Sequence, residues 1–336
     1  MAKAPTVEDV AERAGVSRQT VSNVLNTPDI VRPATRERVI AAIHELGYRR
    51  HAAARQLRLR RSSTIGIRLD PYLGGISGVV LDRFVHAITE RASERGMRML
   101  VYAARTREEE IQRLSELWEG SEIDAAIITG TSRDDPRVRS LDQDGLPFIS
   151  FGRPWGEDDI ADPRHLWVDV DGAAGTRAAT EHALTRGGSV AFLGWPTGSG
   201  TGDDRERGWR EAMAAAGARG TRLTAEEGVP FARACVDAAL AAGPGPVPDA
   251  VVCASDSLAV GALLAVAAAG LSLPVIGFDN TPTAEALGFS SVEQRPEDVA
   301  TAILELLMGP TGEVVAPRTL QAGSAHALIT PELVVR

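Results

Sequence analysis

A short stretch near the N-terminus, TVEDVAERAGVSRQTVSNVLN at 6–26, constrains the fold more than any other part of the chain. Thr6 followed by Asp9 forms a capping box, which begins a helix by pairing two of its first backbone N–H groups. Gly15 stands where the chain must reverse, because glycine adopts a left-handed conformation without steric cost. The apolar residues between them share one face at helical spacing: Val10, Ala11 and Ala14. The pattern predicts a helix that ends in a tight turn.

A second helix is predicted directly after the turn, because Ser17 is a good N-cap. Its apolar face consists of Val21, Val24 and Leu25, and its polar face of Arg18, Gln19, Ser22 and Asn23. Two such helices are typical of a helix-turn-helix whose second helix enters the major groove of DNA. A helical hairpin without that role has the same spacing, so the motif alone leaves both interpretations open.

The next segment predicts a third helix, from Pro33 to Leu46. Proline suits a first helical turn, and Gly47 suits the C-cap. The expected apolar stripe is Val39, Ile40, Ile43 and Leu46. Together the three helices make a module of about fifty residues that is able to bury one small core.

Charge is distributed unevenly along the chain. Residues 1–63 hold 12 Lys and Arg against 6 Asp and Glu, a balance of +6. The whole chain carries 36 and 45, so the remainder holds 24 basic and 39 acidic residues, a balance of −15. A basic module on an acidic body indicates a polyanionic partner. A merely solvated charge run explains the arginines less well, since they coincide with the helix-turn-helix.

Residues 50–59, RHAAARQLRL, form an arginine-rich segment in which Ala53, Ala54 and Leu57 share a helical face. So short a helix is marginal in water by itself. It is expected to order when its arginines meet phosphates. A flexible basic linker is the alternative.

From Ser63 onward, apolar strand-like runs alternate with helical patterns. The expected strands are 64–69, 97–103, 124–130, 146–151, 189–195, 249–255 and 273–279. The expected helices lie near 78–95, 106–119, 172–186, 203–217, 231–242, 257–269 and 296–308. This order predicts an α/β fold of parallel sheets covered on both faces, and its length favours two lobes. Ligands in such folds bind beyond the carboxyl ends of the strands.

Composition excludes several other classes of protein. No apolar run approaches the roughly 20 residues that cross a bilayer, and the N-terminus lacks the apolar region of a signal peptide. Cys235 and Cys253 look like ordinary core residues, and the six histidines show no ligand spacing. We therefore expect a cytoplasmic protein without disulfide, metal or cofactor.

Enzyme signals are also missing. The GSGTGDD run at 198–204 is not the G-x-G-x-x-G fingerprint and predicts a flexible loop before a helix. Asp203 and Asp204 together suggest an acid–base pair, but adjacent acids before a helix are more often partners of its dipole. We predict no catalytic residues.

The order of motifs resembles the LacI/GalR family of bacterial transcription repressors over essentially the whole chain. The N-terminal stretch is followed by TRERVIAAIHELGY, AARQL, VDVDGAAGTRAATEHAL, an arginine before GW at 205–209, SDSLAVGAL and VIGFDN. The resemblance implies a helix-turn-helix domain at 1–49, a hinge at 50–62 and a core at 63–336 that resembles periplasmic sugar-binding proteins. We expect lobe 1 at about 63–162 and 293–321, and lobe 2 at about 163–292 and 322–336.

The resemblance also implies DNA-contacting residues. Arg18, Gln19 and Asn23 occupy the positions that face base edges; many members have arginine where Asn23 stands. The positions that usually touch the phosphate backbone are Thr6, Ser17, Thr20, Ser22, Asn26 and Tyr48. The hinge would lie in the minor groove, with Ala54, Arg55 and Leu57 contacting DNA and Leu57 as the wedge that kinks it. Arg50 and His51 replace the usual proline and asparagine of the hinge.

An effector site between the lobes is implied in the same way. Arg205 and Asp279 match ligand-binding positions, and this pair suits the vicinal hydroxyls of a polyol. The further residues implied are Ser255, Asp256, Trp167 and Gln294, and weaker candidates that follow apolar strands are Asp70, Tyr72, Arg153 and Trp155. Trp167 would stack on a ligand; packing in the core is the alternative for this residue.

The sequence thus predicts a repressor whose affinity for double-stranded, pseudo-palindromic operator DNA is controlled by a small-molecule effector, a carbohydrate by preference. The alternatives are a non-sugar effector such as a purine, a ligand that acts as corepressor, or a sugar-modifying α/β enzyme fused to a DNA anchor. A plain solute-binding protein does not fit the basic module. We expect a homodimer without a C-terminal tetramer coil and without membrane attachment.

Overall fold

The computed structural model describes residues 5–48, 61–69, 78–156, 160–242, 247–309, 313–314 and 325–336. The chain divides into two compact units, Met1–Arg61 and Ser62–Arg336, and each is described by itself. The hinge residues Ala54, Arg55 and Leu57 lie outside the described residues, as do Asp70 and Tyr72.

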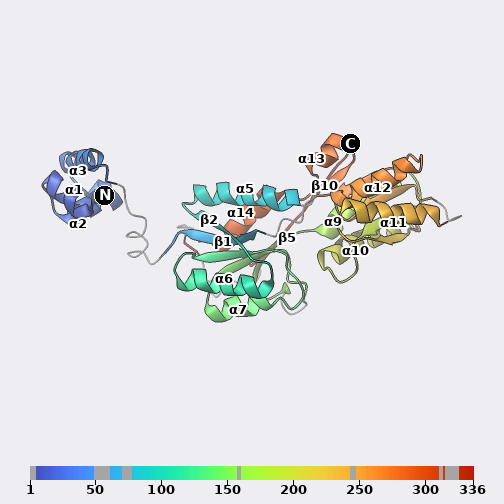
Figure 1. Cartoon of the computed structure of the whole chain (residues 1–336), viewed down its shortest axis with the longest axis horizontal. Helices are drawn as coiled ribbons and strands as arrows, with labels where there is room; N and C mark the ends of the chain where they lie inside the picture. The colour runs from blue at the N-terminus through green and yellow to red at the C-terminus, as the bar shows by residue number, and fades with distance from the viewer. Residues whose placement is uncertain are drawn as a thin grey trace. The chain divides into compact units, whose positions relative to one another are not determined.

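The first unit is the predicted three-helix module (Figure 1). Its helices are α1 (Val7–Ala14), α2 (Arg18–Asn26) and α3 (Pro33–Leu46), with a 3₁₀ turn at Pro28–Ile30. The capping box at Thr6 and the left-handed turn at Gly15, with φ 64°, are both confirmed. Val10, Val21 and Val39 meet at the fully buried centre. One expectation was wrong: Ile40 is 43% exposed, and Ala42 takes its place in the stripe.

The second unit contains two six-stranded sheets, one in each lobe. The first sheet has the spatial order β11 (His326–Ile329), β5 (Leu166–Val170), β4 (Phe148–Phe151), β3 (Ala125–Ile128), β1 (Thr64–Leu69) and β2 (Arg98–Ala103). Its strand pairs are all parallel. Helices α5 (Gly78–Glu94) and α14 (Pro296–Leu307) cover one face, and α6 (Arg107–Glu119) and α7 (Pro136–Asp144) cover the other (Figure 1). Apolar clusters fill both interfaces.

The second sheet repeats this plan. Its order is β12 (Glu332–Val334), β10 (Ser291–Glu293), β9 (Val275–Phe278), β8 (Ala250–Cys253), β6 (Val190–Gly194) and β7 (Arg222–Thr224). The edge strand β12 is antiparallel. The helices are α9 (Gly172–Leu184), α10 (Thr201–Ala215), α11 (Val229–Ala241), α12 (Asp256–Ala268) and the short α13 (Pro282–Leu287). One apolar cluster joins the sheet to its helices.

Close packing of α9 on α10 explains the Gly208–Trp209 pair. A Cβ on Gly208 would lie 2.1 Å from the carbonyl oxygen of Ala173, so only glycine allows the two backbones to approach. The indole of Trp209 then donates to the carbonyl of Val190 on β6. This contact fixes the helix that carries Arg205.

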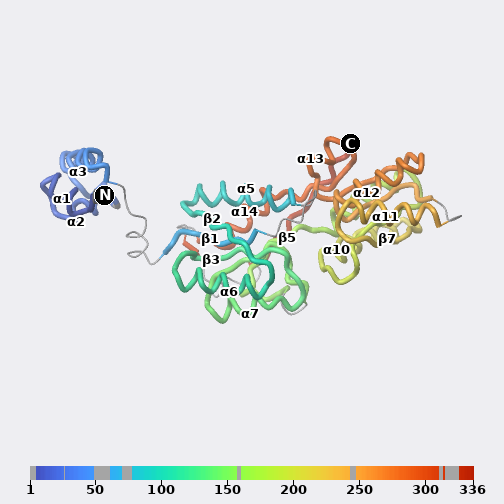
Figure 2. The backbone as a smooth tube through the Cα atoms, in the orientation of Figure 1, coloured from blue at the N-terminus to red at the C-terminus, as the bar shows by residue number. Residues whose placement is uncertain are grey.

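The chain passes between the lobes after β5, after β10 and after β11 (Figure 2). The predicted boundaries at 163 and 322 were therefore too early, because β5 and β11 pair with each other in the first sheet. The boundary near 293 agrees with the packing of α14 in the first lobe. The error arose because Asp169 interrupts the apolar run of β5 and hides it as a strand.

Every strand and helix expected from the alternating pattern is present, and the structure adds others. The added elements are β5, β7, β10, β11 and β12, together with α7 and α13. Most are three to five residues long or amphipathic, so they give little periodic signal. Cys235 and Cys253 are free. Within the described residues, no helix is long and apolar enough to cross a membrane, and no group of three His, Cys, Asp or Glu is placed to hold a metal ion.

Candidate functional site

The first candidate surface is the polar face of α2 in the N-terminal unit. Ser17 begins this helix, since its hydroxyl accepts the backbone N–H of Thr20 and contacts the Thr20 hydroxyl at 2.9 Å. Arg18 and Gln19 are exposed on the first turn. The buried Val21 and Val24 on the opposite face hold this turn outward.

Two side-chain contacts order the exposed face. Arg18 is 2.7 Å from Glu8 on α1, and Gln19 donates to the Asn23 amide oxygen at 2.9 Å. The Gln19 oxygen and the Asn23 amide nitrogen stay available as an acceptor and a donor. Such a pair matches the groups that adenine presents in the major groove, and a guanidinium matches guanine.

The second candidate site is a cleft between the two lobes of the core. A cavity of about 650 Å³ is lined by Val80, Trp195–Ser199, Arg205, Glu226, Glu227, Asp279 and Gln294. A neighbouring cavity of about 260 Å³ shares Val80, Arg205 and Gln294 with it. The smaller one is also lined by Thr129, Thr131, Arg153, Trp155, Asp169 and Asp204. Both lie at the carboxyl ends of parallel strands, where α/β folds bind ligands.

Arg205 stands at the centre of the cleft. Its guanidinium lies 3.7 Å above the ring centroid of Phe278 and 5.4 Å from that of Trp195. One terminal nitrogen donates to the carbonyl of Ala254 and is 3.6 Å from the Asp279 carboxylate. Burial lowers the pKa of Arg205 from its usual value, and the nearby carboxylates oppose this shift.

Asp279 lies at the end of β9 and faces Arg205. Its φ of 117° is unusual for a residue with a side chain, and it turns the chain directly after the buried strand. Gln294 donates to its carboxylate at 2.6 Å. Burial raises the pKa of Asp279 to about 7, although the Arg205 charge acts to lower it. The site therefore holds a carboxyl group that titrates near neutral pH.

Arg153 connects the two lobes at the smaller cavity. It comes from the end of β4 and is 2.7 Å from both Asp169 on β5 and Asp204 on α10. Its guanidinium also lies 4.7 Å from the ring centroid of Trp155. Burial acts to lower the pKa of Arg153, but the two carboxylates raise it above its usual value. Burial raises the pKa of Asp169 despite that arginine.

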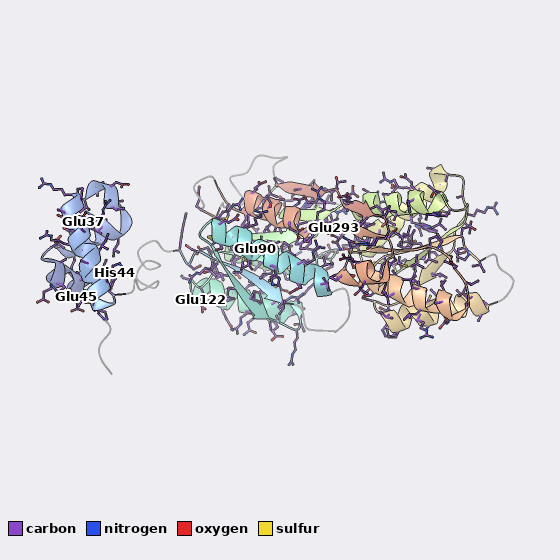
Figure 3. All side chains as sticks on the ribbon, turned by 90° about the horizontal axis from the view of Figure 1, so that it is seen from above. Glu37, His44, Glu45, Glu90, Glu122 and Glu293 are labelled. Carbon is purple, nitrogen blue, oxygen red and sulfur yellow. The ribbon has the colours of Figure 1, made fainter. Side chains whose placement is uncertain are left out.

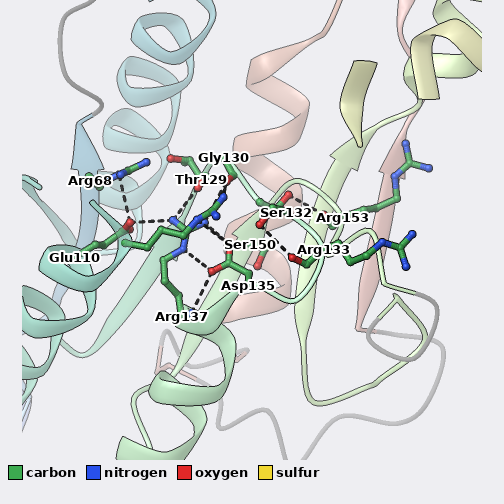
Figure 4. Close-up of polar contacts among 12 residues, drawn as sticks. Arg68, Glu110, Thr129, Gly130, Ser132, Arg133, Asp135, Arg137, Ser150 and Arg153 are labelled. Carbon is green, nitrogen blue, oxygen red and sulfur yellow. Dashed lines mark hydrogen bonds and ion pairs between the residues drawn. The ribbon is translucent and has the colours of Figure 1, made fainter. Parts of the chain in front are cut away.

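The loop after β3 is fixed by a second, fully buried ion network (Figure 4). Arg137 on α7 donates to the carbonyls of Thr129 and Gly130 and pairs with Glu110 and Asp135. The next residue, Thr131, donates to the carbonyl of Arg153 at 2.7 Å. The network thus holds one wall of the smaller cavity through the backbone.

A further ion pair joins the lobes beside the cleft. Arg83 on α5 binds Glu293 on β10 at 3.0 Å, and Figure 3 labels Glu293 where the two lobes meet. Glu293 also accepts from Asn280, next to Asp279. The contact links the first lobe to the strand end that carries Gln294.

Comparison with known proteins identifies the family. Residues 6–51 match the model "Bacterial regulatory proteins, lacI family", and residues 181–336 match the "Periplasmic binding protein-like domain". The HTH-type transcriptional regulator CelR of Thermobifida fusca is 34% identical over 93% of this chain and 94% of its own. The chain belongs to the lacI family.

Solved structures agree with this assignment. A CelR–cellobiose complex is similar with a TM-score of 0.68 and 30% identity, covering 99% of both chains. The lac repressor dimer bound to operator and the anti-inducer ONPF has a TM-score of 0.81 and 25% identity, covering 99% of this chain and 98% of its own. The predicted α/β fold with an N-terminal helix-turn-helix is confirmed, and the chain is a transcription regulator rather than an enzyme.

The structure brings together Arg205, Asp279, Gln294 and Arg153 among the predicted effector residues. Ser255 is adjacent: it caps α12 and donates to Glu227 of the cavity wall. The structure does not place Asp256 in the cleft. Its carboxylate accepts three hydrogen bonds, from the backbone and hydroxyl of Thr281 and from Ser291, and so fixes β9 to β10.

Trp167 lines neither cavity. Its indole donates to the carbonyl of Ile160 and stacks on His326 with ring centroids 4.8 Å apart. Core packing, which was the alternative for this residue, is what the structure shows. Among the described residues, the aromatic side chains that line the two cavities are instead Trp195, Trp155 and Phe151, of which only Trp155 was a weak candidate.

Several cleft residues escaped the sequence analysis, namely Trp195, Glu227, Asp169, Asp204 and Thr129. Asp203 lies in the first turn of α10, and its carboxylate accepts the backbone N–H of Gly198 in the preceding loop. Asp204, like Asp203, was predicted to be a partner of the helix dipole, yet it is buried and binds Arg153. Position after a strand end was the available signal for Trp195, which directly follows β6.

Proposed function

We propose that this chain is a sequence-specific transcription repressor, controlled by a sugar bound between the lobes of its core. The observation that carries the proposal is the convergence of Arg205, Asp279 and Gln294 on one large cavity, in a chain that also has a helix-turn-helix with an exposed polar face. A regulator needs both a reader of DNA and a sensor of a small molecule. The relatives named above supply the precedent for joining them.

The DNA side rests on the N-terminal unit and the hinge. Arg18, Gln19 and Asn23 read base edges, while the other N-terminal residues named in the sequence analysis contact phosphates. Leu57 of the hinge wedges into the minor groove. A homodimer presents two copies of α2 to a pseudo-palindromic operator. The lac repressor dimer bound to operator supports this arrangement, and we place the protein in the cytoplasm.

A sugar fits the chemistry of the cleft. The carboxylate of Asp279 and the guanidinium of Arg205 grip adjacent hydroxyls, and Trp195 offers an apolar ring to C–H groups. Among the described residues that line the larger cavity, one arginine stands against three acidic residues, Asp279, Glu226 and Glu227, so the cavity disfavours an anion such as a sugar phosphate. The similar CelR structure carries cellobiose. A purine effector stays the alternative of a different chemical class.

Effector and operator oppose each other in this proposal. An effector that closes the lobes disfavours the lobe arrangement in which the hinge binds DNA, and so weakens operator binding. By linkage, bound operator weakens effector binding by the same factor. If the effector is instead a corepressor, effector and operator each strengthen the binding of the other. Removing residues 1–61 is expected to abolish specific operator binding and to leave sugar binding intact.

A melting-temperature screen tests the sensor. Cellobiose, maltose, lactose, sucrose and their monosaccharides are added to the full chain, since a binder stabilises the folded state. We expect at least one sugar to raise the melting temperature, and Asp279→Ala to weaken its binding roughly 10- to 100-fold by calorimetry, as for a lost charge-assisted hydrogen bond. Binding of adenine or guanine in place of every sugar would favour the alternative.

A further inference from the structure

Two turns beside the cleft hold the backbone in left-handed conformations. The first follows β9, where Asp279 has a φ of 117° and Asn280 a φ of 44°. The second follows β10, where Arg295 has a φ of 57°. Residues with a side chain seldom adopt a positive φ, because Cβ then crowds the backbone, although asparagine and aspartate tolerate it better than arginine. Such conformations persist only where the surrounding structure holds them.

The two turns set the relative position of two effector-site residues. The strands β9 and β10 are parallel neighbours, so their ends lie side by side. Asp279 begins the first turn, and Gln294 directly precedes the second. Gln294 donates to the Asp279 carboxylate at 2.6 Å, and both residues line the larger cavity. A change in either turn would therefore displace one of these side chains relative to the other.

A single carboxylate bonds to both turns. Glu293 is the last residue of β10. Its Oε2 accepts the side-chain amide N–H of Asn280 at 2.9 Å, and its Oε1 accepts the backbone N–H of Arg295 at 2.9 Å. The backbone N–H of Asn280 also donates to the Ser291 hydroxyl at 2.9 Å. Glu293 is thus the residue that connects the first turn to the second.

The Glu293 carboxylate is itself held from the other lobe (Figure 3). One guanidinium nitrogen of Arg83 lies 3.0 Å from Oε2 and 3.2 Å from Oε1. Burial acts to raise the pKa of Glu293, but the hydrogen bonds from Asn280 and from the Arg295 backbone lower it below its usual value, and Arg83 acts in the same direction. Glu293 is therefore ionised at neutral pH, and both of its oxygens accept hydrogen bonds.

Glu293 lies outside the cavities. Its side chain is 17% exposed and lines neither of them, whereas Gln294, the next residue, lines both. This difference agrees with the alternation of side chains along an extended strand. An effect of Glu293 on a bound sugar therefore has to pass through the residues that its carboxylate holds.

We propose that Glu293 is a positioning residue for the effector site. Its carboxylate holds the two left-handed turns that place Asp279 and Gln294. Arg83 orients this carboxylate from the first lobe, so the position of the two effector-site residues depends on how the lobes are arranged. The inference rests on the proposed function and adds a means of regulation to the same site.

The test separates the bonds to the turns from the ion pair between the lobes. Glu293→Ala removes both, and Arg83→Gln removes the ion pair but keeps the carboxylate. Glu297→Gln is the matched control. Glu297 also pairs with Arg83, at 3.4 Å, but bonds to neither turn in the part of the chain that the structure describes. Calorimetry on the full chain measures the affinity for cellobiose, maltose, lactose and sucrose, and for glucose, galactose and fructose.

The expected losses of affinity follow the number of contacts removed. For the sugar that wild type binds most tightly, Glu293→Ala is expected to weaken binding roughly tenfold and Arg83→Gln about threefold. Glu297→Gln is expected to change the affinity by less than about twofold. If Glu293→Ala does not fold, Glu293→Gln replaces it. This variant keeps one acceptor oxygen and is expected to weaken binding about threefold.

Glycine substitutions distinguish positioning from a general loss of packing. Glycine adopts left-handed conformations without a Cβ clash, so a chain with Asn280→Gly and Arg295→Gly depends less on the carboxylate to form its turns. In that background, Glu293→Ala is expected to weaken sugar binding less than about threefold, against roughly tenfold in the wild-type background. A residue that contributes only to packing would cause the same loss in both backgrounds.

Two results would overturn the inference and leave the proposed function standing. In the first, Glu293→Ala binds its sugar no more weakly than Glu297→Gln does. In the second, Glu293→Ala causes the same loss of affinity in the glycine background as in the wild-type background. Failure of all seven sugars to bind the wild-type chain would overturn the proposed function itself.

Discussion

Asp279 both turns the chain at the end of β9 and places a carboxyl group in the cleft. It ends a fully buried strand at a φ of 117° and holds a carboxylate beside Arg205 and Gln294. The resemblance of the VIGFDN motif to the LacI/GalR family was enough to predict Asp279. The sequence did not reveal that burial would raise its pKa to about 7.

The raised pKa of Asp279 should make the free energy of unfolding depend on pH. The folded protein holds the Asp279 proton up to about pH 7, whereas the unfolded chain releases it near the ordinary value of 3.8. Between these limits the folded state binds more protons, so the free energy of unfolding falls as pH rises from about 4 to about 7. The fall attributable to this residue is at most about 4 kcal/mol.

Asp279→Asn removes the titration and nearly preserves the shape. Urea unfolding at a series of pH values is expected to show wild type losing stability relative to Asp279→Asn through that window. Parallel pH profiles for the two proteins would show that the carboxylate does not carry a raised pKa.

Residues that only pack locally were the hardest to separate from residues that face the cleft. Asp256 and Trp167 occur in the same motif contexts as true cleft residues, but one fixes β9 to β10 and the other stacks on His326. Whether the side chain of Asp256 or Trp167 points toward the cleft depends on which elements pack beside it. For Trp167, the neighbouring residue His326 is more than a hundred positions away in the chain, so the local sequence gives no indication of the contact.

Among the elements, α1 and α2 follow from sequence almost residue by residue. A capping box, a left-handed glycine and a serine N-cap each have a local mechanism, and each is present. The short strands β5 and β10 have no comparable signal, because their pairing with β11 and β12 is set by distant parts of the chain. Local elements were therefore predictable, and the lobe boundaries beside β5 and β11 were not.

The turn at Gly15 allows a test at this scale. A Cβ there meets nothing within 4 Å, so Gly15→Ala costs only the left-handed backbone, about 1 kcal/mol. Gly15→Asn should cost less, because asparagine tolerates that conformation. All five tryptophans lie beyond residue 62, so their fluorescence reports the core alone.

Helical circular dichroism reports both units, so Gly15→Ala is expected to lower the midpoint of the part of that signal that changes apart from the tryptophan fluorescence, and to leave the tryptophan transition in place. A shift of both transitions together would mean that the N-terminal unit does not unfold separately from the core.

At the scale of the whole molecule, the chain joins a basic reader to an acidic sensor. The net charge of +6 over residues 1–63 attracts the phosphates of DNA, and the net charge of −15 over the remainder repels them. The core contains a cleft between its lobes, and Arg153 from the first lobe binds Asp204 from the second lobe across it. A ligand that contacts both sides alters the balance between lobe arrangements.

Operator binding with and without sugar tests the central claim most directly. A high-affinity duplex is first selected from random DNA, and fluorescence anisotropy then measures its affinity for wild type and Asp279→Ala. The account predicts that a sugar concentration just sufficient to saturate wild type weakens operator binding about 5- to 150-fold in wild type and has little effect on Asp279→Ala, whose cleft stays mostly empty at that concentration. The same operator affinity with an empty and a saturated cleft in the wild-type protein would contradict it.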